Sequence, residues 1–129
     1  MAQSAWEKYG LAEKLMRILD VESYDPDHHF GRPFLTAYQI AILFKNMYPE
    51  IYVRLNMPLG GKGTGIHHSL AQYLARMLSQ HIRNGSLPGV EGRFLQMNNI
   101  SSMEFDDFGE SVEASSLSDL SMFRLKDDL

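Results

Sequence analysis

The sequence predicts a helix-rich α+β fold, on three observations. The 129-residue chain has the length of one domain, and its composition, 44% hydrophobic and 22% charged, is that of a globular protein. Apolar residues recur at helical spacing in three stretches, whereas two shorter stretches alternate between apolar and polar residues as strands do. The helical stretches are residues 5–20, 37–47 and 66–83, and the alternating ones are residues 90–97 and 100–105.

The first predicted helix covers residues 5–20, and a turn follows it. Charged residues lie between its regularly spaced apolar residues, as in a helix with one buried side. The run Asp25-Pro26-Asp27 has the composition of a turn, which ends the helical pattern. The apolar residues of this helix are Trp6, Tyr9, Leu11, Leu15, Ile18 and Leu19.

The second predicted helix runs from Ala37 to about residue 47. Thr36 and Gln39 have the spacing of a capping box, in which each side chain accepts a hydrogen bond from the backbone N–H of the other residue. The helix is expected to end before Pro49, because the residue before a proline avoids the helical conformation. Pro49 can itself begin a short helix that extends to Leu55.

Four glycines fall within six positions, Gly60 to Gly65, before the longest predicted helix. Glycines allow close backbone approach and a helix start presents free N–H groups, so an anion such as phosphate fits here. A flexible connector is the alternative. The loop is not a Walker A motif, because Lys62 is followed by Gly63 rather than by serine or threonine.

The helix predicted over residues 66–83 has an apolar and a polar side. Residues spaced three or four apart share a face, so the polar residues form one stripe, which is either solvated only or a contact surface. Asn84-Gly85 is expected to end this helix. The apolar stripe is Leu70, Leu74, Met77, Leu78 and Ile82, and the polar stripe is His68, Gln72, Arg76, Ser79 and Arg83.

The alternating stretches 90–97 and 100–105 are predicted to pair as a hairpin around Asn98-Asn99. Residues 106–129 are acidic and rich in serine. They are predicted to form a tail that is either partly disordered or folded as a short docked helix. The domain prediction is therefore a single domain over residues 1–105 and a tail over residues 106–129. The apolar residues of the alternative docked helix are Leu117, Leu120 and Phe123.

The net charge of −4 is unevenly distributed along the chain. Residues 1–31 carry three basic and six acidic residues, residues 32–93 carry seven basic and two acidic ones, and residues 94–129 carry two basic and eight acidic ones. A basic block flanked by acidic ends points to an anionic partner, with the tail covering the block when the partner is absent. A chance unevenness of surface charge is the alternative.

The predicted order of a leading helix, a helix, a short helix, a long helix and a hairpin resembles that of bacterial winged helix-turn-helix DNA-binding domains. The resemblance covers residues 33–105, and the glycine-rich insertion departs from the usual tight turn. It implies a winged-helix-like domain whose long helix recognises double-stranded DNA. The stretches that carry the resemblance are residues 35–41 (LTAYQIA) and 69–76 (SLAQYLAR).

In such a complex the polar stripe lies in the major groove, where Gln72 suits adenine and Arg76 suits guanine. Arg93 would contact phosphate or the minor groove, and Lys62 with the glycine-loop N–H groups would hold a phosphate. We therefore predict a DNA-binding module, either a transcription regulator or the recognition component of a larger system. The predicted nucleic-acid- or anion-binding residues are Lys62, Gly63, Thr64, His68, Gln72, Arg76, Arg83 and Arg93.

Other function classes are excluded or weaker. The chain has no cysteine, which excludes disulfides, thiol catalysis and cysteine-ligated metals. Its histidines lack the spacing of metal ligands and no nucleophile motif occurs, so neither a metal, another cofactor nor catalysis is expected. The first alternative to DNA binding is a non-enzymatic protein-interaction module that forms homo-oligomers. The second is an enzyme acting on a phosphate-bearing ligand at the glycine loop.

Location and assembly are also predicted from the sequence. The chain has no signal-peptide pattern and no apolar run long enough to cross a membrane, so a cytoplasmic protein without a membrane partner is expected. A homodimer is expected for the DNA-binding form.

Overall fold

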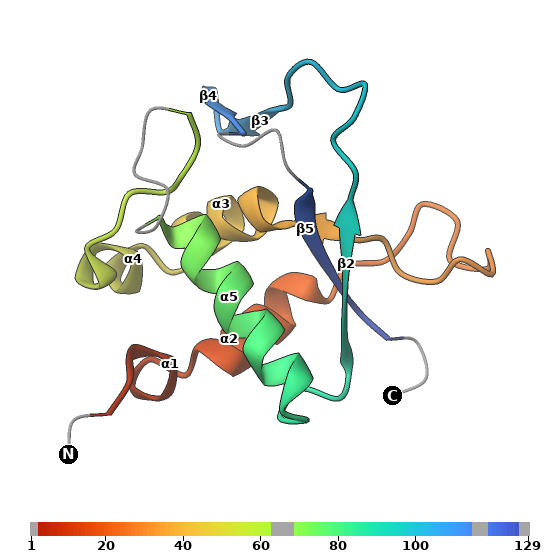
Figure 1. The fold of residues 1–129 in the computed structure, drawn as a ribbon. Helices are drawn as coiled ribbons and strands as arrows, with labels where there is room; N and C mark the ends of the chain where they lie inside the picture. The colour runs from red at the N-terminus through yellow and green to blue at the C-terminus, as the bar shows by residue number, and fades with distance from the viewer. Residues whose placement is uncertain (1–2, 63–68, 115–118, 127–129) are drawn as a thin grey trace.

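The computed structural model describes residues 3–62, 69–114 and 119–126, which form an α+β fold (Figure 1). Helices account for fewer than half of these residues, so the expectation of a mostly helical chain is too strong. The elements are α1 (Ala5–Lys8), α2 (Leu11–Leu19), β1 (Leu35–Thr36), α3 (Ala37–Met47), α4 (Pro49–Leu55), α5 (Leu70–Arg83), β2 (Val90–Leu95), β3 (Glu104–Asp107), β4 (Glu110–Glu113) and β5 (Leu120–Leu125).

The core lies between helices α2, α3 and α5 and one face of a three-stranded antiparallel sheet of order β1-β5-β2. Phe123 on β5 faces Gly92 on β2, and Ile82 of α5 lies over the same point. A Cβ atom on Gly92 would lie 3.2 Å from the Phe123 ring, so glycine permits this close approach. The largest fully buried side chains are Phe44, Leu11, Leu15, Leu19, Ile40, Leu70, Leu74, Leu78 and Val90.

The first predicted helix is two helices, α1 and α2. The break falls at Gly10, which has the left-handed conformation (φ 58°) and precedes the first residue of α2. Glycine adopts this conformation without a steric cost, whereas a continuous right-handed helix cannot contain it. The apolar spacing nevertheless predicts the buried side correctly, because Leu11, Leu15 and Ile18 are buried.

The predicted capping box of α3 is confirmed. The backbone N–H of Gln39 donates to the Thr36 hydroxyl at 3.2 Å, and the backbone N–H of Thr36 donates to Oε1 of Gln39 at 2.7 Å. Pro49 is the first residue of α4, also as predicted. These helix starts depend on residues at most three positions apart, and for this reason they can be predicted from the sequence.

Replacement of Thr36 by alanine is expected to lower the free energy of unfolding by about 1 kcal/mol, because the first turn of α3 loses its side-chain acceptor. Urea denaturation followed by circular dichroism measures the change. Ser4→Ala at the exposed, four-residue α1 is the matched control, and it should cost less than Thr36→Ala. An equal cost at both positions would contradict a special role for the Thr36 cap.

Helix α5 begins at Leu70 rather than at residue 66. Its N-cap is Ser69, which has extended backbone angles and accepts from the N–H of Gln72 at 3.2 Å. Helical spacing alone places the start too early, because the pattern of apolar residues does not identify the residue at which the helical backbone conformation begins. The predicted end is confirmed, since Asn84 is the C-cap residue.

The predicted hairpin of residues 90–97 with residues 100–105 is wrong. The turn at Asn98-Asn99 forms, with the N–H of Ile100 donating to the carbonyl of Met97 at 3.1 Å, but the stretches around it do not pair. Instead β2 pairs with β5, and β3 pairs with β4. Pairing with β5 places Val90 opposite Leu125, both of which are buried.

The segment 106–129 contains β5, which is the central strand of the three-stranded sheet. The prediction of a docked helix is wrong, because Leu120 and Phe123 lie on this strand and are buried there. Leu117 lies outside the described residues. The acidic, serine-rich composition of the segment therefore gives no sign of its apolar end, where Leu120, Phe123 and Leu125 are buried on β5.

Candidate nucleic-acid interface

The start of α5 has no N–H group left for an anion among its first three residues. The N–H of Leu70 donates to the carbonyl of Pro58 at 2.8 Å, that of Ala71 to the carbonyl of Leu59 at 3.0 Å, and that of Gln72 to the Ser69 hydroxyl. Anion sites at helix starts depend on unpaired N–H groups. The described part of this helix start therefore favours the connector over the phosphate cradle.

The described end of the glycine loop is attached to β4. The N–H of Lys62 donates to the carbonyl of Glu113 at 2.8 Å, and a Cβ atom on Gly61 would lie 2.9 Å from the same carbonyl oxygen. Glycine is required here by this close approach and by a φ of 106°. Of the predicted anion-binding residues, Gly63, Thr64 and His68 lie outside the described residues.

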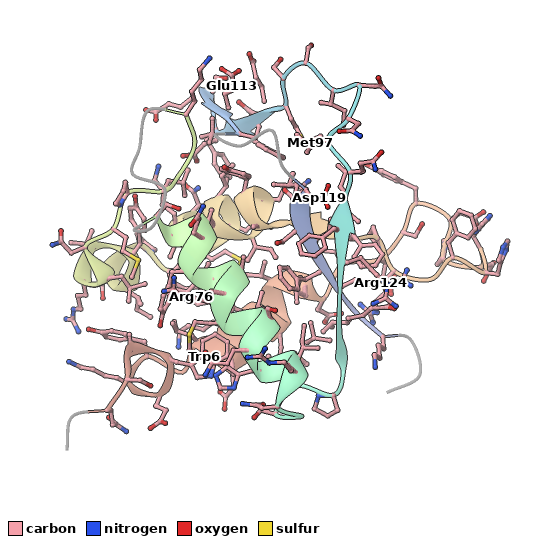
Figure 2. All side chains as sticks on the ribbon, viewed as in Figure 1. Trp6, Arg76, Met97, Glu113, Asp119 and Arg124 are labelled. Atoms are coloured by element: carbon pink, nitrogen blue, oxygen red, sulfur yellow. The ribbon has the colours of Figure 1, made fainter. Side chains whose placement is uncertain are left out.

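The polar stripe of α5 is exposed along most of its length. Arg76 and Arg83 are both exposed, and Gln72 is half-buried (Figure 2 labels Arg76). The two arginines are seven residues apart, so they share one face and lie about 10 Å apart along the helix. The helix contains no acidic residue, and neither arginine forms an ion pair with another described residue.

The side chains that neighbour the polar stripe leave Arg76 and Arg83 exposed. The Arg76 guanidinium lies 5.8 Å from the centre of the Tyr73 ring, a cation–π arrangement on the helix surface. Burial raises the pKa of Tyr73, and the charge of Arg76 offsets part of that rise. Trp6 of α1 stacks on His81 at 4.6 Å, but at about 100° per residue His81 points away from both arginines.

Lys62 and Arg93, two of the residues predicted to bind DNA, each pair with a carboxylate of the same chain. Nη2 of Arg93 lies 2.6 Å from Oε1 of Glu91, and Nζ of Lys62 lies 4.0 Å from Oε1 of Glu113. Lys62 remains 73% exposed, so its weak pair leaves the ammonium accessible. Lys62 lies on the loop before α5, Arg76 on α5 and Arg93 on β2, so the three cations come from three different parts of the fold.

Sequence reasoning missed the buried carboxylate of Asp107. Its two oxygens accept from Nζ of Lys45 at 2.7 Å and from the Asn46 side chain at 3.0 Å, which attaches β3 to α3. Burial alone would raise the pKa of Asp107, but these hydrogen bonds and the charge of Lys45 lower it. The hydrogen bond to Asp107 raises the pKa of Lys45. Lys45, one of the seven basic residues within residues 32–93, is therefore paired with a carboxylate of the fold.

Sequence reasoning also missed the role of Arg124. Its Nε donates to Oε2 of Glu91 at 2.8 Å, its Nη1 donates to the carbonyls of Phe30 and Arg32, and its guanidinium lies 4.4 Å from the Phe34 ring. The hydrogen bond from Arg124 holds the pKa of Glu91 below its usual value. Arg124 therefore fastens the segment before β1 to the sheet, on a different element from Arg76 (Figure 2).

The described residues offer no cluster of three or more His, Asp or Glu side chains that could hold a metal ion. The rings of His28, His29 and Phe30 contact one another in the exposed segment before β1, with ring centres 4.4–4.9 Å apart. The two histidines stack, and Phe30 meets each of them edge to face. Within the described ranges, no helix has the length and apolar character needed to cross a membrane.

Comparison with known proteins finds no matching family model, no similar curated protein and no similar solved structure. The function of this chain is therefore inferred from its own residues and their arrangement.

Proposed function

We propose that the protein binds double-stranded DNA through the exposed face of α5, as a transcription regulator or the recognition component of a larger system. The observation that carries the proposal is the charge of this helix. Arg76 and Arg83 share one face, no acidic residue lies on the helix, and no described carboxylate pairs with either. Unpaired cations on one helix face are the electrostatic footprint of phosphate binding.

The arrangement of elements supports the same proposal. Helices α3 and α5 pack together, and β2 pairs with β5 after them. We interpret this as a winged-helix-like domain in which the described residues between the two paired strands, 96–114 and 119, belong to a long wing. The difference from the expected domain is that the wing spans a longer stretch and contains its own small hairpin, β3–β4.

In the proposed complex α5 lies in the major groove. Gln72 and Arg76, nearer its start, would contact base edges, and Arg83 would contact a phosphate. Lys62 and Arg93 would contribute only after leaving Glu113 and Glu91, so DNA phosphate must replace these carboxylates. The three phosphate contacts, from Lys62, Arg83 and Arg93, predict a slope of about −3 in a plot of log affinity against log salt concentration.

The double replacement Arg76→Ala with Arg83→Ala is expected to weaken binding to a duplex at least about tenfold, because each arginine that binds DNA contributes about 1–3 kcal/mol. Fluorescence anisotropy with a labelled 30-base-pair duplex at about 50 mM salt measures the affinity. The salt slope should become shallower by about one unit for each replaced arginine that binds a phosphate in the parent complex.

Arg17→Ala is the matched control, since Arg17 is an exposed arginine on α2, outside the α5 face. It should leave the affinity within about twofold of the parent chain, because long-range charge effects are screened. No duplex binding by the parent chain at about 50 mM salt would remove the proposal. If Arg17→Ala and the α5 variant lost the same affinity for DNA, binding would depend on the number of positive charges and not on the α5 face, which would contradict the proposal.

A further inference from the structure

The turn of the β3–β4 hairpin carries a strained and exposed aromatic residue. Phe108 and Gly109 join the paired residues Asp107 and Glu110, and their φ values are both positive, 50° and 101°. A two-residue turn of this kind favours asparagine followed by glycine, because a bulky side chain at positive φ meets its own backbone. Phe108 gains no burial in return, since it is 76% exposed. A residue held in a costly conformation without a benefit to the fold indicates a functional contact.

The position of Phe108 is fixed by the residues beside it. Asp107 is buried and accepts a hydrogen bond from Nζ of Lys45, which attaches the hairpin to α3 (Figure 1). Within the turn, the N–H of Gly109 donates to Oδ1 of Asp106 at 2.9 Å. An aromatic ring presented on a fixed turn loses little conformational freedom when a partner binds it, which favours affinity.

Further apolar side chains are exposed on the elements around this attachment. Nζ of Lys45 lies 2.7 Å from the Asp107 carboxylate and 6.0 Å from the centre of the Tyr52 ring, so α3, α4 and the hairpin meet at this ammonium group. On α3 Met47 is 48% exposed, and on α4 Val53 is 72% exposed. Aromatic and methionine side chains are enriched in protein interfaces. We name the exposed apolar residues of these three elements the hairpin surface: Met47, Val53 and Phe108.

The charges of the hairpin are negative. Residues 104–113 include five acidic residues and no basic one. Glu104, Asp106 and Glu110 are exposed, and none of them forms an ion pair with a described cation. The hydrogen bonds that Glu104 and Asp106 accept come from neutral donors, so both carboxylates keep their charge. Electrostatic complementarity therefore selects a cationic partner for this surface and disfavours nucleic acid.

We propose that the hairpin surface binds a cationic amphipathic segment of another protein, with Phe108 as the apolar anchor. Aromatic anchors surrounded by polar groups carry much of the binding energy in protein interfaces. Lysine or arginine side chains of the partner lie against the exposed carboxylates of the hairpin, and its apolar side chains cover the Phe108 ring. A basic amphipathic helix supplies both kinds of side chain on adjacent faces. The site is separate from the α5 face, which carries the opposite charge.

Phe108→Asn separates this role from the stability of the fold. Asparagine tolerates the left-handed conformation and is preferred before glycine in this turn, so the melting temperature should rise. The affinity for the partner should fall at least about tenfold, as expected for loss of an aromatic anchor. The probe is a labelled peptide of about 14 residues, four helical turns, with leucine and lysine at amphipathic spacing. Fluorescence anisotropy without DNA measures its affinity.

Phe94→Asn is the matched control, because Phe94 is a similarly exposed aromatic residue on β2, in the other sheet. It should leave the affinity for the leucine–lysine peptide unchanged. Asp106→Asn combined with Glu110→Gln tests the charge of the surface. The new amide at position 106 keeps an oxygen acceptor for the N–H of Gly109, and the double variant should bind the peptide less tightly. A peptide with glutamate in place of every lysine should not bind the parent chain.

Any of four results would overturn the proposal. The first is a parent chain that does not bind the leucine–lysine peptide, or that binds the glutamate peptide equally well. The second is an equal loss of affinity in Phe108→Asn and Phe94→Asn. The third is a lower melting temperature in Phe108→Asn, which would assign Phe108 to the fold. The fourth is self-association of the parent chain that Phe108→Asn abolishes, measured by analytical ultracentrifugation without peptide, since a second copy would then be the partner. Because DNA is absent, these results do not depend on the proposed function.

Discussion

Deletion of residues 106–129 is expected to unfold the protein. The deletion removes β5, on which Leu120, Phe123 and Leu125 are buried, and leaves β1 and β2 without their shared neighbour. Loss of a buried leucine costs about 2–5 kcal/mol and loss of a buried phenylalanine about 3–5 kcal/mol. Three such losses approach the entire stability of a typical domain, about 5–15 kcal/mol. Thermal denaturation should show no cooperative transition.

A chain that lacks only residues 127–129 is the control, since it keeps all of β5. It should melt cooperatively near the temperature of the full chain. A cooperative transition at the parent temperature in the longer deletion would mean that β5 is dispensable. It would also restore the interpretation of residues 106–129 as a tail that covers the basic block.

Replacement of Asp107 by alanine is expected to lower the free energy of unfolding by about 2–3 kcal/mol, the contribution of a hydrogen-bonded charged group. The variant loses the acceptors for Lys45 and Asn46 and releases β3 from α3. Urea denaturation measures the change. Glu104→Ala is the control on the same strand, since Glu104 is exposed and its hydrogen bond with Ser111 is long at 3.3 Å.

The same residue predicts part of the pH dependence of stability. The pKa of Asp107 is lowered in the folded protein from its usual value of 3.8. The carboxylate therefore stabilises the fold above that value, and this stability is lost as the pH falls through the lower folded-state pKa. Asp107→Asn should lack this component below about pH 5. If the free energy of unfolding of both proteins fell identically with decreasing pH, other carboxylates would be responsible for the loss of stability in acid.

The local features of the fold were predictable because their causes lie within one helical turn. Thr36 and Gln39 satisfy each other's backbone groups, and Pro49 suits the first turn of a helix but not its interior. The buried stripe Leu70, Leu74 and Leu78 follows directly from helical spacing. The exposure of Arg76 and Arg83 on the opposite face follows from the same spacing.

The strand pairing was not predictable in this way. The nearer hairpin closes a shorter loop, but doubling a loop costs only about 0.6 kcal/mol, so nearness decides little. Burial of Phe123 and Leu125 against Gly92 and Val90 decides it instead. Alternation of apolar residues shows that a segment can be a strand, but not which other strand it will meet.

The sequence by itself determined the approximate helix positions, the cap at Thr36, the end of α5 at Asn84, the basic character of residues 32–93 and the polar stripe of α5. The tertiary structure decided which of those charges remain available. Lys45 pairs with Asp107, which is 62 positions away, and Glu91 pairs with Arg124, which is 33 positions away, so neither pair has a local signal. The physical reason is that helix formation depends on neighbours along the chain, whereas pairing depends on what the folded core brings together.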